Sequence, residues 1–381
     1  MDERMKIKDL CINARQASRE LAALPAASKN RALNEIAMAL ERRTAEILRE
    51  NRDDVKEGKA ARLSGALIDR LMLDEDRIRE MARSLRSIAA LPDPVGEVVD
   101  GWRLPNGMEI NKIRVPFGVV AVIYEARPNV TVDAAGLCLK TGNAVILRGG
   151  SASLHSIRML TGVINGALID AGLPEHAVSL VASRARGYLK QLLQRSDYID
   201  LIIPRGGEEL KEYLVKNSKI PVIYAGGGNC HIFVDASADL EKAVKIVINA
   251  KVQRPGVCNA AETLLVHRDI AAEFVPAIAR ELLKRKVKLH VDQESRSLIK
   301  GKADGVIDAT DEDYATEYLD LEMAVKVVDG VDEAVNHITT YGTGHSEAIL
   351  TRNLENSRLF TARVDAACVY INASTLFTDG G

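Results

Sequence analysis

The chain has no apolar run long enough to span a bilayer, and its first residues lack the apolar segment of a secretory signal. Charge of neither sign is in excess: 51 Lys and Arg stand against 53 Asp and Glu, so no broad basic surface for nucleic acid or an anionic membrane is expected. The five cysteines are widely spaced and odd in number, which does not suggest a disulfide framework. These absences favour a protein of the reducing cytoplasm, with neither nucleic acid nor membrane as a partner.

Several catalytic motifs are also missing. The seven histidines are scattered, and without His-Glu-x-x-His or Cys-x-x-Cys spacing we expect no metal site. The absence of Gly-x-Ser-x-Gly disfavours a serine hydrolase, and the absence of a P-loop disfavours a P-loop kinase. Gly-x-Gly-x-x-Gly is absent too, so the sequence lacks the usual fingerprint of a dinucleotide-binding site.

What is present predicts a soluble α/β protein of two or three domains, since 381 residues exceed one typical core. Residues up to about 90 show helical spacing of apolar side chains, as at Leu33, Ile36, Ala37 and Leu40. Asn106-Gly107 then predicts a hairpin, whose exposed edge could pair with another subunit. Beyond it, apolar strands alternate with helices, which indicates parallel sheets covered on both faces. We expect strands at 119–124, 144–147, 178–181, 201–203, 222–224, 231–234, 263–266, 325–328, 349–351 and 369–372.

Two glycine loops follow predicted strands, where ligands of open α/β sheets bind. One contains Arg148, Gly149 and Gly150; the other runs over residues 204–207 before a predicted helix. Glycine lets backbone amides approach a phosphate, and arginine adds charge-assisted bonds, yet a Gly-Gly pair after a strand is more often a plain turn. A third cluster, Gly226 to Gly228, is either a hinge or a place where two backbones approach closely.

Cys258 is the cysteine with the most suggestive surroundings. Pro255 and Gly256 end a predicted helix and leave it on a turn before a strand, where a substrate can reach its thiol. Its position alone leaves a nucleophile and a structural thiol equally open. The other cysteines have ordinary settings: we expect Cys138 in a helix core, Cys368 buried in a strand, Cys11 near a mobile N-terminus, and Cys230, the only rival, packed at a strand start.

Several long segments resemble the γ-glutamyl phosphate reductase family, also called glutamate-5-semialdehyde dehydrogenases, within the aldehyde dehydrogenase superfamily. The resemblance covers nearly the whole chain, in order. It is carried by residues 115–131 (VPFGVVAVIYEARPNVT), 140–150 (KTGNAVILRGG), 253–259 (QRPGVCN), 316–320 (TEYLD) and 372–375 (NAST).

The resemblance implies an aldehyde dehydrogenase-like fold. It places a Rossmann-like cofactor domain at 1–100 and 119–225, an oligomerisation hairpin at 101–118, an α/β catalytic domain at 226–365, and a segment at 366–381 that returns toward the cofactor and oligomerisation region. A homo-oligomer is implied, with glutamate 5-kinase as a possible partner on a separate chain. Family members continue for a few dozen residues beyond the position of Gly381, including a strand used in subunit association.

The implied reaction is the NADPH-dependent reduction of L-glutamate 5-phosphate to L-glutamate 5-semialdehyde and phosphate, the second step of proline synthesis from glutamate. Cys258 would be the nucleophile that carries a thioester, with its own amide and the Asn129 side chain holding the oxyanion. The implied ligands of NADP are Arg148 and Gly149 near the adenosine ribose, Pro204, Gly206 and Gly207 near the pyrophosphate, and Glu317 at the nicotinamide ribose.

Two residues depart from what the resemblance implies. Hydrolytic aldehyde dehydrogenases carry a general-base glutamate where this chain has Ala225, which suits phosphate rather than water as acyl acceptor. Members of the reductase family have arginine where this chain has Leu376, which could weaken the binding of an anionic substrate. One alternative is an aldehyde dehydrogenase that releases a free acid, against which Ala225 argues. The other is a catalytically silent member that acts as a binding protein, which Leu376 favours.

Overall fold

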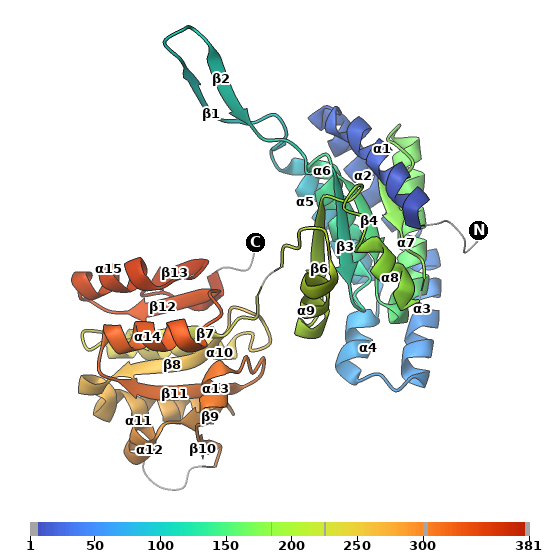
Figure 1. Ribbon diagram of the computed structural model, residues 1–381. Coiled ribbons are helices and arrows are strands. Elements are labelled where there is room, and N and C mark those ends of the chain that lie inside the picture. Colours follow the sequence, from blue (N-terminus) through green and yellow to red (C-terminus); the bar gives the residue numbers. More distant parts are fainter. Residues whose placement is uncertain (1–6, 184, 225, 300–303, 378–381) are drawn as a thin grey trace. The chain divides into compact units, whose positions relative to one another are not determined.

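The computed structural model describes residues 7–183, 185–224, 226–299 and 304–377. The chain forms two compact units, Met1–Tyr224 and Ala225–Gly381, which are described one at a time. Each is built on a sheet with helices packed against it (Figure 1). The hairpin lies in the first unit and residues 366–377 lie in the second, while the functions expected of these segments remain predictions.

The first unit begins with helices whose apolar faces meet. In α2, Leu33, Ile36, Ala37 and Leu40 are buried, as their spacing predicts. The helix α5 starts at a cap in which the Asp74 side chain accepts a hydrogen bond from the Arg77 amide. These helices are α1 (Ile7–Ala22), α2 (Ala26–Arg42), α3 (Thr44–Ala60), α4 (Gly65–Leu71) and α5 (Glu75–Ala90).

The predicted hairpin is present as β1 (Val98–Arg103) and β2 (Glu109–Ile113), an antiparallel pair that projects as a separate ribbon in Figure 1. Gly107 turns the chain with a φ of +87°, a backbone conformation that suits glycine. All six β1 residues are exposed, including Trp102. The hairpin therefore contributes nothing to the core of its own unit.

The four-stranded sheet of the first unit is parallel and has the order β5-β4-β3-β6. All six residues of its strand β3 are buried, as expected for a strand covered on both faces. The predicted strand at 222–224 is reduced to one isolated bridge between Val222 and Ile202. The elements are β3 (Val119–Tyr124), α6 (Asn129–Lys140), β4 (Ala144–Arg148), α7 (Leu154–Asp170), β5 (Val178–Leu180), α8 (Arg186–Leu192), β6 (Leu201–Arg205) and α9 (Glu208–Asn217), with a 3-10 turn at Ser151–Ser153.

The second unit holds a seven-stranded parallel sheet in the order β10-β9-β11-β8-β7-β12-β13. Its strands are β7 (Cys230–Val234), β8 (Ala261–His267), β9 (Lys288–Val291), β10 (Val306–Asp308), β11 (Glu322–Val328), β12 (Ser346–Leu350) and β13 (Cys368–Ile371). The sequence reading missed β9 and β10, because these short strands alternate apolar residues with Lys288, His290 and Asp308. Its helices are α10 (Leu240–Val252), α11 (Arg268–Lys284), α12 (Gln293–Leu298), α13 (Asp311–Ala315), α14 (Val331–Tyr341) and α15 (Leu354–Arg363), with a 3-10 turn at Thr375–Phe377.

Two apolar clusters cover the two faces of this sheet. Ile232 and Val234 of β7 belong to one cluster with α10 and α11, whereas Phe233 belongs to the other with α14 and α15. The alternation follows from the pleat, because successive side chains of a strand point to opposite faces. Within the part of the chain described, no helix is both long and apolar enough to cross a membrane.

Candidate functional site

Cys258 lies on the turn that joins α10 to β8. The helix ends at Val252, and Pro255 and Gly256 prevent it from continuing. The Cys258 thiol is exposed, and its carbonyl oxygen accepts a hydrogen bond of 3.3 Å from Sγ of Cys230. Among the described residues nothing accepts a hydrogen bond from the Cys258 amide. A reachable thiol beside a free N–H donor is what nucleophilic attack on an acyl group requires.

The glycine cluster before β7 packs against this turn. A Cβ added at Gly228 would stand 1.4 Å from the carbonyl oxygen of Cys258, so no larger residue fits there. The Gly228 amide donates a hydrogen bond of 2.7 Å to Oε1 of Glu317. The next residue, Asn229, is buried and donates to the carbonyls of Tyr314 and Tyr341. The sequence left the glycine cluster as either a hinge or a place of close backbone approach. At Gly228 it is a close approach, to the backbone of Cys258.

The other cysteines are less accessible than Cys258. Cys230 and Cys138 are buried as predicted, and burial raises the pKa of the Cys138 thiol to about 12. The expectation for Cys11 is wrong: α1 already begins at Ile7 and packs onto the sheet, so Cys11 is buried and its pKa rises to about 11. Cys368 lies in a strand as predicted but is only half-buried, because β13 is an edge strand.

The two phosphate-loop candidates of the first unit lie side by side. Ile123 of β3 pairs with Arg148 of β4 on one side and with Pro204 of β6 on the other. Strand order reverses between β3 and β6, since β4 and β5 lie on the opposite side of β3. Ligands of open α/β sheets bind beyond the carboxyl ends of the strands at such a reversal.

The glycines of these loops serve different purposes. A Cβ at Gly149 would collide with Ile157, at 2.1 Å, and one at Gly206 would come within 2.8 Å of Glu125. Gly207 instead meets nothing within 4 Å and stands directly before α9. Open backbone at a helix N-terminus, beside Arg148 and Arg205, fits a phosphate-bearing ligand such as a dinucleotide.

Glu125 was not singled out by the sequence reading, yet it lies at this point. Its Oε2 accepts a hydrogen bond of 3.2 Å from the Gly207 amide. A phosphate bound at the same amide has to displace this carboxylate. The signal in the sequence was its position directly after β3, which ends at Tyr124.

Asn129, the second expected oxyanion ligand, is the first residue of α6. Its Nδ2 donates to Oδ2 of Asp133, one turn further on, at 3.3 Å. Both residues line a cavity of about 400 Å³ within the first unit. Asn129 and Cys258 belong to different units, so their meeting in one site remains a prediction.

The cavity beside Asn129 carries charges of both signs. Its charged lining residues are Asp69, Arg70, Arg77, Glu80, Arg127 and Asp133. Burial raises the pKa of Asp133, although hydrogen bonds from Asn129 and Ser84 act against this. Burial lowers the pKa of Arg127, and the neighbouring cations Arg70 and Arg205 add to the effect. Neither Arg70 nor Arg127 forms an ion pair with any residue that the structure describes, whereas Arg77 is paired with Asp69 at 2.9 Å.

Comparison with known proteins matches residues 2–312 to the aldehyde dehydrogenase family. The gamma-glutamyl phosphate reductase of Heliobacterium modesticaldum is 55% identical over 367 residues, which are 96% of this chain and 87% of that protein. That of Moorella thermoacetica is 54% identical, with the same shares covered. This chain belongs to the γ-glutamyl phosphate reductases of the aldehyde dehydrogenase family. The resemblance inferred from the sequence motifs is thereby confirmed.

A solved γ-glutamyl phosphate reductase confirms the fold as well. The crystal structure of the enzyme from Thermotoga maritima is 45% identical and superposes with a TM-score of 0.96, covering 98% of this chain and 90% of that one. The aldehyde dehydrogenase-like fold that the motifs implied is therefore correct, and the chain belongs to a family of oxidoreductases.

Ala225, which differs from hydrolytic aldehyde dehydrogenases, and Leu376, which differs from the reductase family, stand differently in the structure. Ala225 lies outside the described residues, so only its residue type enters the argument. Leu376 is half-buried in the short 3-10 turn Thr375–Phe377, where its amide donates to the Ser374 hydroxyl at 3.4 Å.

Sequence reasoning also missed a buried pair of charges at the two ends of the Cys258 turn. Lys251 lies in the last turn of α10 and Glu262 is the second residue of β8, and both side chains are fully buried. The available signal was a lysine and a glutamate inside otherwise apolar runs. Because charged residues are rarely buried unless they are paired, such interruptions indicate a buried ion pair.

Proposed function

We propose that this chain reduces L-glutamate 5-phosphate to L-glutamate 5-semialdehyde and phosphate with NADPH, the second step of proline synthesis from glutamate. The observation that carries the proposal is the exposed Cys258 thiol on its glycine-packed turn, in a chain 55% identical to a gamma-glutamyl phosphate reductase. A reductase that acts on an acyl phosphate needs one reachable nucleophile, and the other four thiols are less exposed.

In the proposed chemistry the Cys258 thiolate attacks the acyl carbon. The C–S bond forms first and the carbonyl pair moves onto oxygen; when the carbonyl re-forms, the C–O bond to phosphate breaks, so phosphate leaves with the bonding pair and a thioester remains on Cys258. Both this step and the next pass through a tetrahedral oxyanion, which the Cys258 amide and Asn129 Nδ2 would stabilise by about 3 kcal/mol each. The unused N–H of Cys258 supports the first assignment.

NADPH, when bound, supplies the hydride that converts the thioester into the aldehyde and frees the thiolate. The residues proposed to hold it are Arg148 and Gly149 at the adenosine ribose, Gly207 with Pro204 and Gly206 at the pyrophosphate, and Glu317 at the nicotinamide ribose. The open backbone at Gly207 before α9 supports the pyrophosphate site. An arginine at position 148 would favour the 2′-phosphate of NADP over NAD.

The type of residue at position 225 supports phosphate as the acyl acceptor of the reverse reaction. Alanine cannot activate a water molecule, so the thioester would be protected from hydrolysis. An aldehyde dehydrogenase that releases a free acid needs such a base, which makes that activity the less favoured alternative.

The cavity beside Asn129 is proposed to take the amino-acid end of the substrate. Asp133 lies one helical turn from Asn129, its carboxylate accepts a hydrogen bond of 3.3 Å from Asn129 Nδ2, and both side chains line the cavity, so both can face one bound substrate. Asp133 would bind the ammonium group, and Arg70 with Arg127, which lack ion-pair partners among the described residues, would bind the carboxylate.

We also infer a cytoplasmic homo-oligomer that joins through the β1–β2 hairpin, and glutamate 5-kinase as a separate partner. The exposed apolar side chains of the hairpin, Val98, Trp102, Met108 and Ile113, support the oligomer because an isolated two-stranded ribbon gains stability only by packing on something else. Analytical sedimentation tests whether the hairpin holds the oligomer together. It compares the mass of the purified chain in solution with that of a variant carrying Trp102→Ser and Ile113→Ser.

The decisive experiment is the phosphate dependence of the reverse reaction. With L-glutamate 5-semialdehyde and NADP, NADPH formation should require added phosphate or arsenate. Equal rates without either would support the acid-releasing dehydrogenase and overturn the proposal. A silent binding protein would show no turnover under any condition, although it would still bind the nucleotide.

A further inference from the structure

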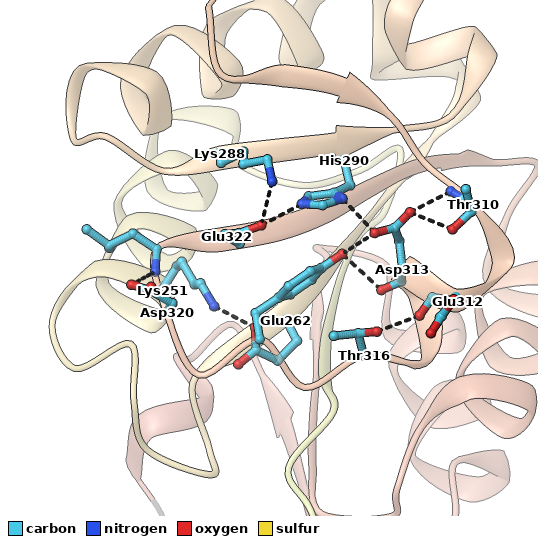
Figure 2. A network of polar contacts seen from close by, with 12 residues as sticks. Lys251, Glu262, Lys288, His290, Thr310, Glu312, Asp313, Thr316, Asp320 and Glu322 are labelled. Carbon is cyan, nitrogen blue, oxygen red and sulfur yellow. Dashed lines mark hydrogen bonds and ion pairs between the residues drawn. The ribbon is translucent and has the colours of Figure 1, made fainter. Parts of the chain in front are cut away.

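Lys251 and Glu262 form a buried ion pair across the neck of the Cys258 turn. Nζ of Lys251 lies 2.5 Å from Oε2 of Glu262, and neither side chain is exposed at all. Figure 2 shows the two groups pointing at each other. Lys251 lies in the last turn of α10 and Glu262 in the first residues of β8, so the pair joins the two chain segments between which Cys258 is held.

The pair does more than hold the two ends together. The second carboxylate oxygen of Glu262 accepts a hydrogen bond of 3.3 Å from the Leu319 amide. Leu319 has a φ of +54°, in the left-handed region where a branched residue is strained. Nζ of Lys251 also stands 6.0 Å from the centre of the Tyr318 ring, the residue before Leu319. A strained residue persists only where its surroundings hold it, and here Glu262 holds it.

Tyr318 is anchored from another direction by Asp313 and His290, two residues of the polar network in Figure 2. Its hydroxyl donates to the backbone carbonyl of Asp313 at 3.1 Å, and its ring packs 4.8 Å from that of His290. His290 lies between two carboxylates, 2.6 Å from Asp313 and 2.8 Å from Glu322. The segment that contains Tyr318 and Leu319 is therefore fixed at both residues.

Glu317 is the residue that this fixed segment presents to the Cys258 turn. It accepts the hydrogen bond from the Gly228 amide, and Gly228 packs on the Cys258 carbonyl. The contacts thus close a ring: Lys251 to Glu262, Glu262 to Leu319, Glu317 to Gly228, and Gly228 to Cys258. Burial raises the pKa of Glu262 to about 7, although the Lys251 ammonium acts in the opposite direction. Keeping a charged carboxylate at this buried position therefore costs folding free energy.

We propose that Lys251 and Glu262 are positioning residues that hold the Cys258 thiol and the Glu317 carboxylate in one fixed register. The catalytic consequence rests on the proposed function of Cys258, whereas the geometry of the thiol does not. An ion pair suits this task better than apolar packing, because Glu262 must also accept the Leu319 amide, and an apolar residue of the same size would leave that strained amide without its acceptor.

The test compares the double variant Lys251→Met/Glu262→Leu with Lys251→Met, Glu262→Gln and the parent. The apolar pair removes both buried charges together, so it avoids the unpaired charge that destabilises a single variant. Glu262→Gln retains an oxygen that can accept the Leu319 amide. The matched control is Lys245→Met/Glu241→Leu, which removes an exposed pair on the same helix α10. Three quantities are measured: the midpoint of thermal unfolding, kcat, and the rate of Cys258 alkylation by iodoacetamide. Alkylation is followed on the Cys258 peptide by mass spectrometry, because the half-buried Cys368 can also react.

We expect the double variant to unfold within about 5 °C of the parent. Its kcat should nevertheless fall at least about tenfold, as a displacement of the reacting groups by less than about 1 Å implies. Its Cys258 alkylation rate should change several-fold, and Glu262→Gln should recover part of both losses. The control should match the parent in all three quantities.

A folded variant without the ion pair that keeps the parent's alkylation rate and kcat would overturn the proposal. So would losses that follow the unfolding midpoint alone, with no recovery in Glu262→Gln, since those describe a purely structural pair. If the double variant does not fold, Glu262→Gln and Lys251→Met carry the same test. Absence of phosphate-dependent turnover in the parent would instead remove the proposed function, and the alkylation rates would still decide whether the pair positions the thiol.

Discussion

Oε1 of Glu317 accepts a 2.7 Å hydrogen bond from the backbone amide of Gly228, although 89 positions separate the two residues. Gly228 in turn lies so close to the Cys258 carbonyl that only glycine fits. One hydrogen bond therefore ties the residue expected at the nicotinamide ribose to the turn that carries the expected nucleophile. Changes at either end should be felt at the thiol.

Substituting Gly228 should disable the Cys258 turn. In Gly228→Ala the new methyl group would stand 1.4 Å from the Cys258 carbonyl oxygen, so the turn has to move. We expect kcat to fall about 100-fold or more, because a shift near 1 Å in the reacting groups has that effect. Gly166→Ala is the control: that exposed site in α7 has open space around it, and the change should raise stability by up to about 1 kcal/mol without loss of activity. Equal activity of both variants would show that the close approach is not needed.

Removing the thiol should separate chemistry from binding. Cys258→Ala should abolish turnover but preserve NADPH binding, because the proposed cofactor residues other than Glu317 lie in the first unit. Nucleotide fluorescence measures the binding. Cys11→Ala, in the first unit, should keep its turnover. If Cys258→Ala loses both turnover and binding with its circular dichroism intact, Cys258 is more than a nucleophile.

The Arg148 side chain should set the choice between NADP and NAD. Without its charge-assisted bond to the 2′-phosphate, worth about 1.5–3 kcal/mol, Arg148→Ala should lower the ratio of kcat/KM for NADP over NAD at least tenfold. Arg49→Ala, a substitution of an exposed arginine in α3, should leave the ratio unchanged. A constant ratio in Arg148→Ala would exclude it from the 2′-phosphate site.

Recognition of the substrate's ammonium group should depend on Asp133. For the parent, we expect kcat/KM for glutamate 5-semialdehyde to exceed that for glutarate semialdehyde, which lacks the amino group. Asp133→Asn should reduce this preference about tenfold or more, the value of one charge-assisted hydrogen bond. Asp76→Asn, an exposed control in α5, should preserve it. Equal loss of activity toward both substrates would mean that Asp133 acts only by orienting Asn129, whose Nδ2 it binds.

Acid should destabilise the second unit through His337. Burial lowers the pKa of His337 to about 3, with His231 acting in the same direction, and neither ring nitrogen has a partner among the described residues. Above about pH 6.5 the His337 imidazole is neutral in both the folded and the unfolded chain, so it does not lower the free energy of unfolding there. Below that pH only the unfolded chain binds a proton, and stability should fall by about 1.4 kcal/mol for each pH unit down to about pH 3.

His337→Phe should remove this pH dependence and keep the ring contacts with Tyr314 and Tyr341. Urea unfolding between pH 7 and pH 4 measures the effect, and a slope as steep in His337→Phe as in the parent would contradict the assignment.

The sequence by itself determined the features that depend on near neighbours in the chain. Apolar runs such as that of β3 specify buried strands, Asn106-Gly107 specifies the hairpin, and Pro255 with Gly256 places Cys258 on a turn, because each acts through the local backbone. The long motifs were also enough to identify the reductase family, which the comparisons confirm.

Only the tertiary structure decided which distant residues meet. The pairing of β7 with β8 brings Gly228 onto Cys258, and the connection before β11 brings Glu317 and Leu319 to the same place. Periodicity cannot reveal such contacts, because they depend on strand order rather than on spacing along the chain. For the same reason the burial of Cys11 was not predicted from the sequence. The part that Glu262 plays in the fold likewise became clear only when the structure showed its partner Lys251.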